Sequence, residues 1–296
     1  MRVAITGTSG RLGSALARAF APETVLPWTR PAYDLDVPFA VDDVIDHDRP
    51  DLVLHAAAWT DVDACARKPE LAMRRNAAAV RELALACASR DVDLVVVSTN
   101  EVFAGERCDG AYEPADETRP TNPYGESKLA GEVAAREAFA DARGARLFVV
   151  RTAWLFGDPG NDFPEKIVRA ARTARAAGNP LRVVGDEIGT PSYAPDVARF
   201  VRALVTPSRR GTTVHAVNAG RCSRAEWALE ILRLAGELLR AETVPLAAWK
   251  RDSTPPRCAP LAPTLLSDVP APRTWQAATA EYVPLLLQRL GTPVRR

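Results

Sequence analysis

A tyrosine and a lysine four residues apart form the pair of side chains in this chain best suited to chemistry. Tyr124 and Lys128 lie in the segment Tyr-Gly-Glu-Ser-Lys. Positions i and i+4 of a helix share one face, so the phenol and the ammonium can reach the same bound molecule. A nearby cation lowers the pKa of a phenol from about 10, so we expect Tyr124 to exchange a proton with a carbonyl or alcohol oxygen. Thr99, at the end of an apolar run, would hold that oxygen. A simple packing role at a helix start is the alternative for Tyr124.

A glycine-rich turn near the N-terminus predicts a site for a dinucleotide. The apolar run Arg2 to Thr6 is followed by Gly-Thr-Ser-Gly-Arg-Leu-Gly and then by an amphipathic segment. Gly7 would allow the tight turn, Gly10 the approach of a pyrophosphate, and Gly13 the close packing of helix on strand. The free N–H groups and the dipole of the helix N-terminus would favour the phosphates. Glycines that serve only a turn are the alternative.

The elements that must position these groups alternate between apolar runs and helical patterns. We expect strands at Arg2 to Thr6, Thr24 to Trp28, Asp51 to His55, Val92 to Ser98 and Arg146 to Val150. We expect helices at Arg11 to Phe20, Pro69 to Ser89 and Tyr124 to Ala140. Continuous apolar strands separated by helices predict an α/β fold, a Rossmann-type doubly wound parallel sheet that binds ligands at the carboxyl ends of its strands. His55 would pack at a strand end.

The pattern loosens after Val150, which predicts a smaller C-terminal α/β region for the substrate. We expect a dinucleotide-binding domain over residues 1–150 and a mainly substrate-binding region over 151–296, some segments of which return to the Rossmann sheet. Short strands are predicted at Leu181 to Val184 and Thr213 to Val217, and helices at Phe163 to Ala177, Pro195 to Val205, Arg224 to Leu239 and Thr274 to Leu290. The Pro-rich segment Thr254 to Pro263 would form a wall or lid over the substrate. We interpret Arg169, Arg172 and Arg175 as a solvated helix face.

Composition limits the classes of partner. The chain has 296 residues, with 38 basic and 37 acidic side chains. Its net charge is therefore close to zero, which gives no electrostatic indication of a nucleic-acid or membrane-surface partner. The five cysteines are scattered without metal-ligand spacing, which predicts reduced thiols and neither a disulfide framework nor a metal. The chain enters a strand at once and has no apolar run of membrane-spanning length, so we expect a cytoplasmic protein.

Together these segments resemble the extended short-chain dehydrogenases/reductases, and within them the dTDP-4-dehydrorhamnose reductases. The resemblance covers most of the chain and is strongest before about Val197. It is carried by Thr6 to Gly13, Ala56 to Asp63, Pro69-Glu70 with Asn76-Ala77, Ser98 to Phe103, Pro120 to Glu132, Arg151 to Phe156 and Val183 to Ser192. The order and spacing of these blocks are specific.

The resemblance implies that NAD(P)H reduces the C4 ketone of dTDP-4-dehydro-L-rhamnose. Tyr124 would protonate the developing alkoxide, Lys128 would bind the nicotinamide ribose, and Thr99 would hold the reacting oxygen. The implied cofactor-binding residues are Gly7, Ser9, Gly10, Arg11, Leu12, Gly13, Thr29, Arg30, Asp34, Leu35, Ala56, Ala57, Ala58, Thr60 and Lys128. The implied substrate-binding residues are Val62, Asn100, Glu101, Trp154, Asn161, Phe163 and Arg257. Trp154 would stack on the sugar or base, or else belong to the core.

The end of the second strand indicates which cofactor is used. An acidic residue there receives the ribose hydroxyls of NAD, whereas an arginine accepts the 2′-phosphate of NADP. This chain offers Thr29 and Arg30 and no carboxylate. We therefore expect NADP(H) to be preferred, with NAD(H) as the alternative; a merely solvated Arg30 is the other interpretation.

Two departures from the family pattern concern the substrate. Asn100 and Glu101 stand where many members have Asp-Tyr, and Arg257 is followed by Cys-Ala-Pro-Leu-Ala instead of a Ser-x-Leu pattern. Arg257 would still bind a diphosphate. Another nucleotide-linked 4-keto-6-deoxyhexose is therefore an alternative substrate, and a non-catalytic regulatory subunit of the same fold is an alternative function. We expect a monomer or a homodimer.

Overall fold

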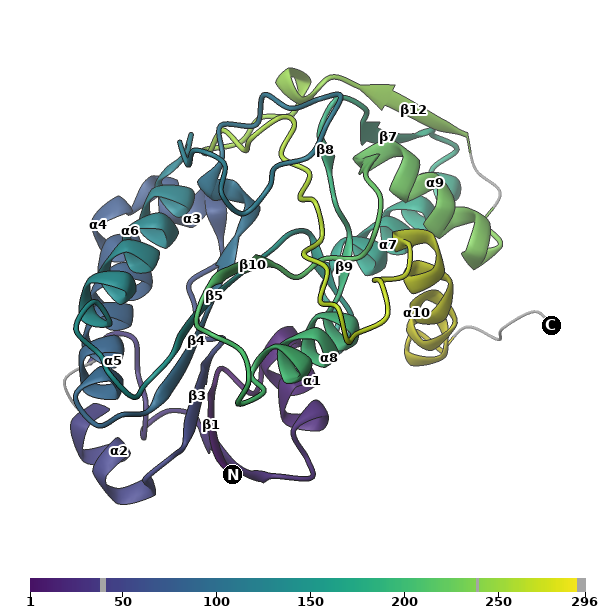
Figure 1. Cartoon of the computed structure of the whole chain (residues 1–296). Coiled ribbons are helices and arrows are strands. Elements are labelled where there is room, and N and C mark those ends of the chain that lie inside the picture. The colour runs from purple at the N-terminus through teal and green to yellow at the C-terminus, as the bar shows by residue number, and fades with distance from the viewer. Residues whose placement is uncertain (38–40, 238–239, 292–296) are drawn as a thin grey trace.

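The central feature is a six-stranded parallel sheet with helices on both faces (Figure 1). The computed structural model describes residues 1–37, 41–237 and 240–291. The strand order is β10-β5-β4-β3-β1-β2, and every pairing is parallel. The strands are β1 (Arg2–Thr6), β2 (Thr24–Trp28), β3 (Leu52–His55), β4 (Asp93–Thr99), β5 (Leu147–Thr152) and β10 (Thr213–His215). The predicted α/β fold is confirmed.

Apolar side chains pack both faces of the sheet. One face is covered by α1 (Arg11–Ala19) and α8 (Ala194–Leu204), and their core includes Ile5, Leu16 and Val201. The other face is covered by α2 (Val41–Asp48), α5 (Ala79–Ala88) and α6 (Pro123–Ala138), around residues such as Ile45 and Leu83. The sheet is therefore buried on both faces, as its continuous apolar strands predict.

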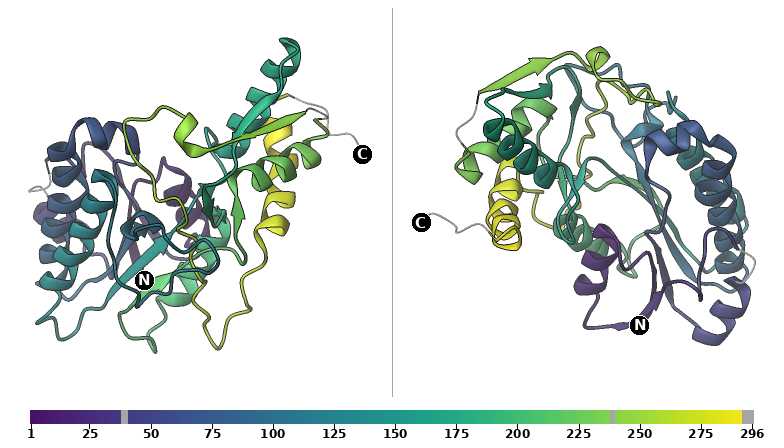
Figure 2. Two further views of the ribbon diagram at one scale, coloured as in Figure 1. Left: turned by 90° about the horizontal axis from the view of Figure 1, so that it is seen from above. Right: turned by 180° about the vertical axis from the view of Figure 1, so that it is seen from behind.

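A second lobe forms around an aromatic core of its own, at the end of the molecule away from α2 and α5 (Figures 1 and 2). Trp227, Phe156 and Tyr282 lie at its centre and are fully buried. Its helices are α7 (Phe163–Ala176), α9 (Arg224–Ala235) and α10 (Trp275–Arg289). Its strand pairs are β7–β12 (Leu181–Val184, Ala241–Val244), β8–β11 (Ile188–Gly189, Cys222–Ser223) and β6–β9 (Leu155–Phe156, Ser192–Tyr193).

Elements from beyond residue 150 complete the main sheet and its cover. Thr213–His215 pairs with β5 as the edge strand β10, and α8 packs on α1. A domain boundary near residue 150 stays a prediction.

The predicted helix Pro69 to Ser89 is interrupted in the structure. It consists of α4 (Pro69–Met73), a π-helical turn η2 (Arg74–Ala78) and α5. Asn76 in this turn bonds the backbone of Trp59 through both ends of its amide, at 2.8 and 3.0 Å. The helices α2 and α3 (Val62–Arg67) and the 3₁₀ turns η3 (Asn100–Val102) and η4 (Leu246–Ala248) were not among the predicted elements.

Candidate active site

Thr99, Tyr124 and Lys128 meet in one cavity of about 300 Å³ at the carboxyl edge of the sheet. Thr99 is the last residue of β4. Tyr124 and Lys128 lie in the first turns of α6, which begins at Pro123 after its N-cap Asn122. The three side chains are 4 to 8% exposed. The predicted catalytic groups are thus assembled by the start of one helix and the end of one strand.

The electrostatics of this pair differ from the sequence expectation. Burial raises the pKa of Tyr124 above its usual value of 10, a nearby Glu101 adds to the rise, and a hydrogen bond with Thr99 opposes it. The net direction is therefore upward, opposite to the lowering expected from the sequence. Lys128 Nζ donates to the Val97 carbonyl at 2.7 Å, and burial lowers the pKa of Lys128 to about 8. Tyr124 is therefore a protonated phenol at neutral pH, which suits an acid.

A buried ion pair supports the helix that carries Lys128. Arg151 Nε and Nη2 donate to the two carboxylate oxygens of Glu132 at 2.9 and 2.7 Å. Arg151 is 3% exposed and Glu132 is fully buried. This bidentate geometry ties α6 to β5, and the Glu132 charge favours the ammonium form of Lys128.

The glycine-rich turn has the geometry of a phosphate cradle. Gly7 has a φ of 70°, and a Cβ there would lie 2.9 Å from the Ala57 nitrogen. A Cβ on Gly13 would lie 2.1 Å from the Gly7 carbonyl oxygen. Gly10 is the N-cap of α1 and brings no side-chain hydrogen bond, so the N–H groups of the first turn are open to an anion. The residues present therefore fit a dinucleotide.

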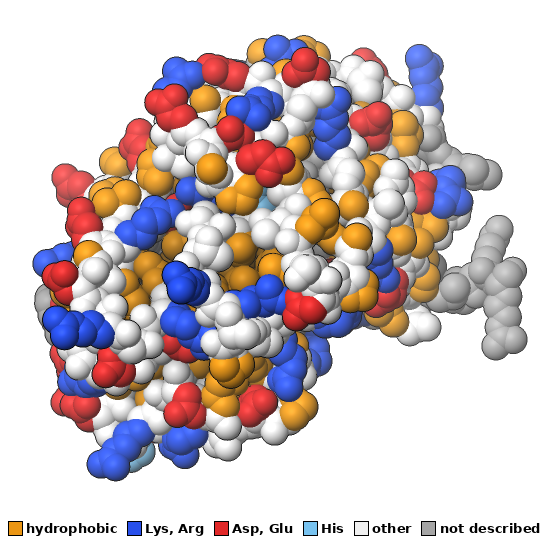
Figure 3. Space-filling model, viewed as in Figure 1, with side chains coloured by type: hydrophobic (Ala, Val, Ile, Leu, Met, Phe, Trp, Pro, Cys, Tyr) orange, Lys and Arg blue, Asp and Glu red, His pale blue; other side chains and the backbone are white. Residues whose placement is uncertain are grey.

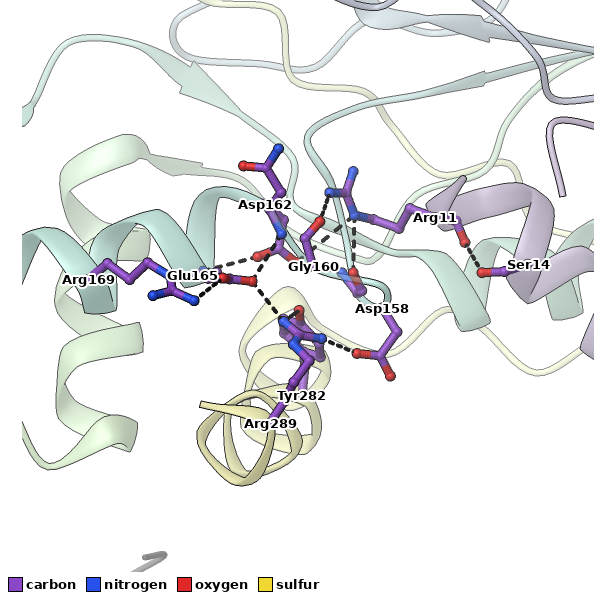
Figure 4. Close-up of polar contacts among 11 residues, drawn as sticks. Arg11, Ser14, Asp158, Gly160, Asp162, Glu165, Arg169, Tyr282 and Arg289 are labelled. Atoms are coloured by element: carbon purple, nitrogen blue, oxygen red, sulfur yellow. Dashed lines mark hydrogen bonds and ion pairs between the residues drawn. The ribbon is translucent and has the colours of Figure 1, made fainter. Parts of the chain in front are cut away.

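Arg11, on the first turn of α1, joins this cradle to the second lobe. Its guanidinium donates to the carbonyls of Gly157 and Gly160 at 3.1 and 2.8 Å and lies 4.0 Å from Asp162. Figure 4 shows that polar contacts continue from this loop to α10, because Glu165 at the start of α7 accepts a hydrogen bond from Arg289. Arg11 also lines the cavity. The predicted cofactor residue thus also ties the cofactor loop to a neighbouring loop.

The end of β3 closes the cradle from the other side. Thr6 Oγ1 accepts from Ala57 N at 3.0 Å and pairs with His55 Nδ1 at 3.0 Å. His55 is buried and its ring meets Tyr33 edge-on, which confirms its predicted packing role. Of the remaining predicted cofactor residues, Leu12, Ala56, Ala58 and Thr60 line the cavity.

The predicted adenine-side residues follow β2. Thr29 and Arg30 are exposed, and no described carboxylate pairs with Arg30. Asp34 Oδ1 accepts from Asp36 N at 3.0 Å, and Leu35 packs at the margin of the core beneath the sheet. Arg30 is therefore available to a phosphate group.

The predicted substrate residues separate into two sets. Val62, Asn100, Glu101 and Trp154 line the cavity. Asn161, Phe163 and Arg257 are not part of its lining. Phe163 stacks on Trp227 with ring centres 4.8 Å apart, and Arg257 lies 3.6 Å from Asp186. The roles of both sets stay predictions.

Arg224 and Thr152 are among the cavity residues to which the sequence prediction assigned no role. Arg224, the first residue of α9, lies 3.5 Å above the Trp154 ring and donates to Glu187 at 2.9 and 3.0 Å. Thr152 ends β5 beside Thr99. The only sequence signal at Arg224 is the helix start Ser-Arg-Ala-Glu, which says nothing of where that helix lies in space.

The Pro-rich segment lies beside the cavity, and it corrects the cysteine prediction. Cys108 and Cys258 form a disulfide, whereas Cys65, Cys87 and Cys222 are free and buried. The prediction of five reduced thiols is wrong for this pair because the loop after Phe103 runs along the Pro-rich segment. Cys258 N donates to the Gly105 carbonyl at 2.8 Å, and Asn100 Nδ2 donates to the Ala259 carbonyl at 3.2 Å.

The arginines of α7 pair with carboxylates. Arg169 contacts Glu165, and Arg172 and Arg175 contact Glu237. Over the described ranges, no cluster of three metal-ligating side chains occurs, and no helix has the length and apolarity to cross a membrane. The face in Figure 3 carries acidic and basic side chains interspersed.

Comparisons with known proteins agree with this geometry. The family described as the RmlD substrate binding domain matches residues 1–287. A dTDP-4-dehydrorhamnose reductase of Mycobacterium tuberculosis is 40% identical over 230 residues, 75% of this chain and 72% of the relative. A dTDP-4-keto-6-deoxy-D-glucose reductase of Streptomyces niveus is 34% identical over 235 residues, 78% of each chain.

A solved structure extends the match to nearly the full length. The dTDP-4-dehydrorhamnose reductase of Bacillus anthracis in complex with NADP superposes with a TM-score of 0.87 and 30% identity, over 96% of this chain and 99% of that one. The chain therefore belongs to the dTDP-4-dehydrorhamnose reductase family.

Proposed function

We propose that this chain uses NADPH to reduce the C4 ketone of dTDP-4-dehydro-L-rhamnose to dTDP-L-rhamnose. The observation that carries the proposal is the meeting of Thr99, Tyr124 and Lys128 in one cavity beside the glycine cradle. A membership of the reductase family alone would not require these side chains to be buried together at the end of β4.

The proposed chemistry divides between the three side chains. Tyr124 donates its phenolic proton to the C4 oxygen as negative charge develops there, since burial keeps it protonated. Thr99 holds the same oxygen by a hydrogen bond. The Lys128 ammonium stabilises the phenolate left behind and binds the ribose hydroxyls. NADPH, when bound, supplies the hydride.

NADPH is the proposed reductant because of two features of the described chain. The Gly7–Gly13 turn leaves room and open N–H groups for a pyrophosphate. The exposed Arg30 offers a cation to a 2′-phosphate, and the end of the second strand, Leu26 to Arg30, has no carboxylate for the adenosine ribose. The NADP bound to the Bacillus anthracis relative supports this choice.

A second candidate substrate is another nucleotide-linked 4-keto-6-deoxyhexose. Asn100 and Glu101 line the cavity at the positions where this chain departs from the Asp-Tyr of the family pattern, which would give the sugar pocket a different chemistry. The Streptomyces niveus relative, named for dTDP-4-keto-6-deoxy-D-glucose, supports this alternative. A cytoplasmic monomer or homodimer stays a prediction, which the mass of the purified protein in solution checks in part.

The first test is the oxidation of NADPH, followed at 340 nm, with either dTDP-4-keto sugar as substrate. The wild type is expected to turn over, and Tyr124→Phe to lose at least about 100-fold in kcat, the usual contribution of a positioned acid. Glu126→Gln, which changes an exposed side chain of the same helix with no proposed role, is the matched control and should keep the wild-type rate. Equal rates for Tyr124→Phe and wild type would remove Tyr124 from the mechanism, and equal efficiency with NADH would remove the NADPH preference.

A further inference from the structure

Glu101 lies in the cavity in which the proposed keto sugar would react. It lines the cavity with Thr99, Tyr124 and Lys128. It lies in the 3₁₀ turn η3 directly after β4, and its backbone N donates to Thr99 Oγ1 at 3.2 Å. This bond fixes the backbone of Glu101 two residues from the hydroxyl that would hold the ketone oxygen.

One oxygen of the Glu101 carboxylate is anchored and the other is not. Asn122 Nδ2 donates to Glu101 Oε2 at 2.7 Å. Asn122 is itself held, because its Oδ1 accepts from Gly125 N at 2.9 Å and its Nδ2 also donates to the Thr254 carbonyl at 3.1 Å. Among the described residues, no side chain donates to Oε1 of Glu101. That oxygen is left for a ligand.

The surroundings of Glu101 suit proton transfer near neutral pH. Burial raises its pKa to about 7, the Asn122 hydrogen bond opposes the rise, the Glu187 charge adds to it, and Arg251 and Arg224 oppose it. Of the carboxyl groups with a resolved shift in residues 1–37, 41–237 and 240–291, it is the one whose pKa is raised. A base whose pKa lies near the working pH is the most effective kind.

The proposed substrate is a carbon acid, because a ketone acidifies the C–H bonds on both neighbouring carbons. We propose that Glu101 is a catalytic base that removes and returns a proton at a carbon next to the C4 ketone. This inference rests on the proposed reductase function and adds a second reaction at the same site. It would allow the enzyme to exchange the proton on a carbon beside the ketone before reduction, with retention of configuration, since the same carboxylate removes and returns it.

The step balances without a further reactant. The Glu101 carboxylate takes the proton, the C–H electron pair forms a C=C bond, and the carbonyl π pair moves to the C4 oxygen. Tyr124 donates its proton to that oxygen, and Thr99 holds it. In the reverse direction Tyr124 regains its proton, the ketone re-forms, and Glu101 returns a proton that has exchanged with water. Glu101 and Tyr124 line the same cavity, so both groups can reach one bound sugar.

The test follows deuterium from solvent into the sugar. The keto sugar is incubated with the full-length enzyme in D₂O with NADP⁺, then reduced by added NADPH, and the product is examined by mass spectrometry and NMR at C3 and C5. Uptake without enzyme is subtracted. The wild type is expected to incorporate one deuterium beside C4, and Glu101→Gln to lower the ratio of incorporation to reduction at least tenfold.

Controls separate this role from structural damage. Glu106→Gln alters an exposed carboxylate that pairs with Arg119 and should keep the wild-type ratio. Titration of NADPH fluorescence shows whether Glu101→Gln is folded. Two results overturn this inference and leave the proposed function intact. The first is reduction by the wild type without enzyme-dependent deuterium uptake. The second is a ratio of incorporation to reduction that is equal in Glu101→Gln and the wild type, whatever the KM of the variant. Failure of the wild type to oxidise NADPH overturns the proposed function as well.

Discussion

At the scale of single residues, burial of the Lys128 ammonium in the site lowers the free energy of unfolding of the protein. Burial lowers the pKa of Lys128 from 10.5 to about 8, a shift that corresponds to on the order of 3 kcal/mol against its charged form. We expect Lys128→Met to raise the free energy of unfolding at pH 7 by up to about 3 kcal/mol and to lose reductase activity. Between pH 8 and 10.5 the unfolded wild type binds more protons than the folded one, so wild-type stability should rise with pH there, and the variant should lack that rise.

Urea unfolding at pH 7, 8.5 and 10 measures both effects. Lys166→Met changes an exposed lysine on α7 and is the matched control, expected to alter neither the stability at pH 7 nor the slope. A Lys128→Met protein less stable than the wild type at pH 7 would contradict this prediction. It would show that the hydrogen bond from the ammonium to the Val97 carbonyl stabilises the fold by more than the burial of the charge destabilises it.

At the scale of elements, the fit of α1 against the turn that follows β1 depends on the absence of a single methyl group. A Cβ on Gly13 would lie 2.1 Å from the Gly7 oxygen and 2.9 Å from the Thr8 nitrogen, both backbone atoms. Gly13→Ala must therefore move the turn, and we expect it to destabilise the protein by about 1–3 kcal/mol and to weaken NADPH binding more than tenfold. Gly110→Ala, where nothing lies within 4 Å of the new Cβ, should change neither. Equal thermal shifts in both variants would mean that the turn adapts freely.

The same scale shows what the sequence could predict. β1 begins and ends where its apolar run does, since a strand buried on both faces must be apolar throughout. β2 also has its predicted bounds, although it is an edge strand and only Trp28 is buried in it. α2 was missed because Val41 and Ile45 are its only buried positions in a short acidic segment. Thr99 and Tyr124 could be predicted because local motifs specify strand ends and helix starts. Arg224 could not, because its position depends on how the second lobe folds back on the cavity.

At the scale of the whole molecule, a wall beside the cavity is built from two segments far apart in the chain, none of whose described residues is in the cavity lining itself. The loop after Phe103 and the Pro-rich segment pair at Glu106 with Cys258 and at Tyr112 with Leu261. Cys258 also pairs with Ile188, which brings in the second lobe. The wall is therefore a joint between the sheet and the second lobe, and its order depends on long-range contacts that no local pattern encodes.

The disulfide between Cys108 and Cys258 closes a loop of 150 residues at this joint. We expect Cys108→Ser, or a reducing agent on the wild type, to lower the free energy of unfolding by about 2–5 kcal/mol, chiefly through the entropy of the unfolded chain. The KM for the keto sugar should rise as well, because Asn100 beside the catalytic Thr99 is bonded to Ala259 of the same segment. Cys108 is exposed, so a reductant can reach the bond without unfolding the protein. Thiol titration of the unreduced, denatured wild type should find three free thiols, Cys65, Cys87 and Cys222; a count of five would mean that the wall is held by its hydrogen bonds and packing alone.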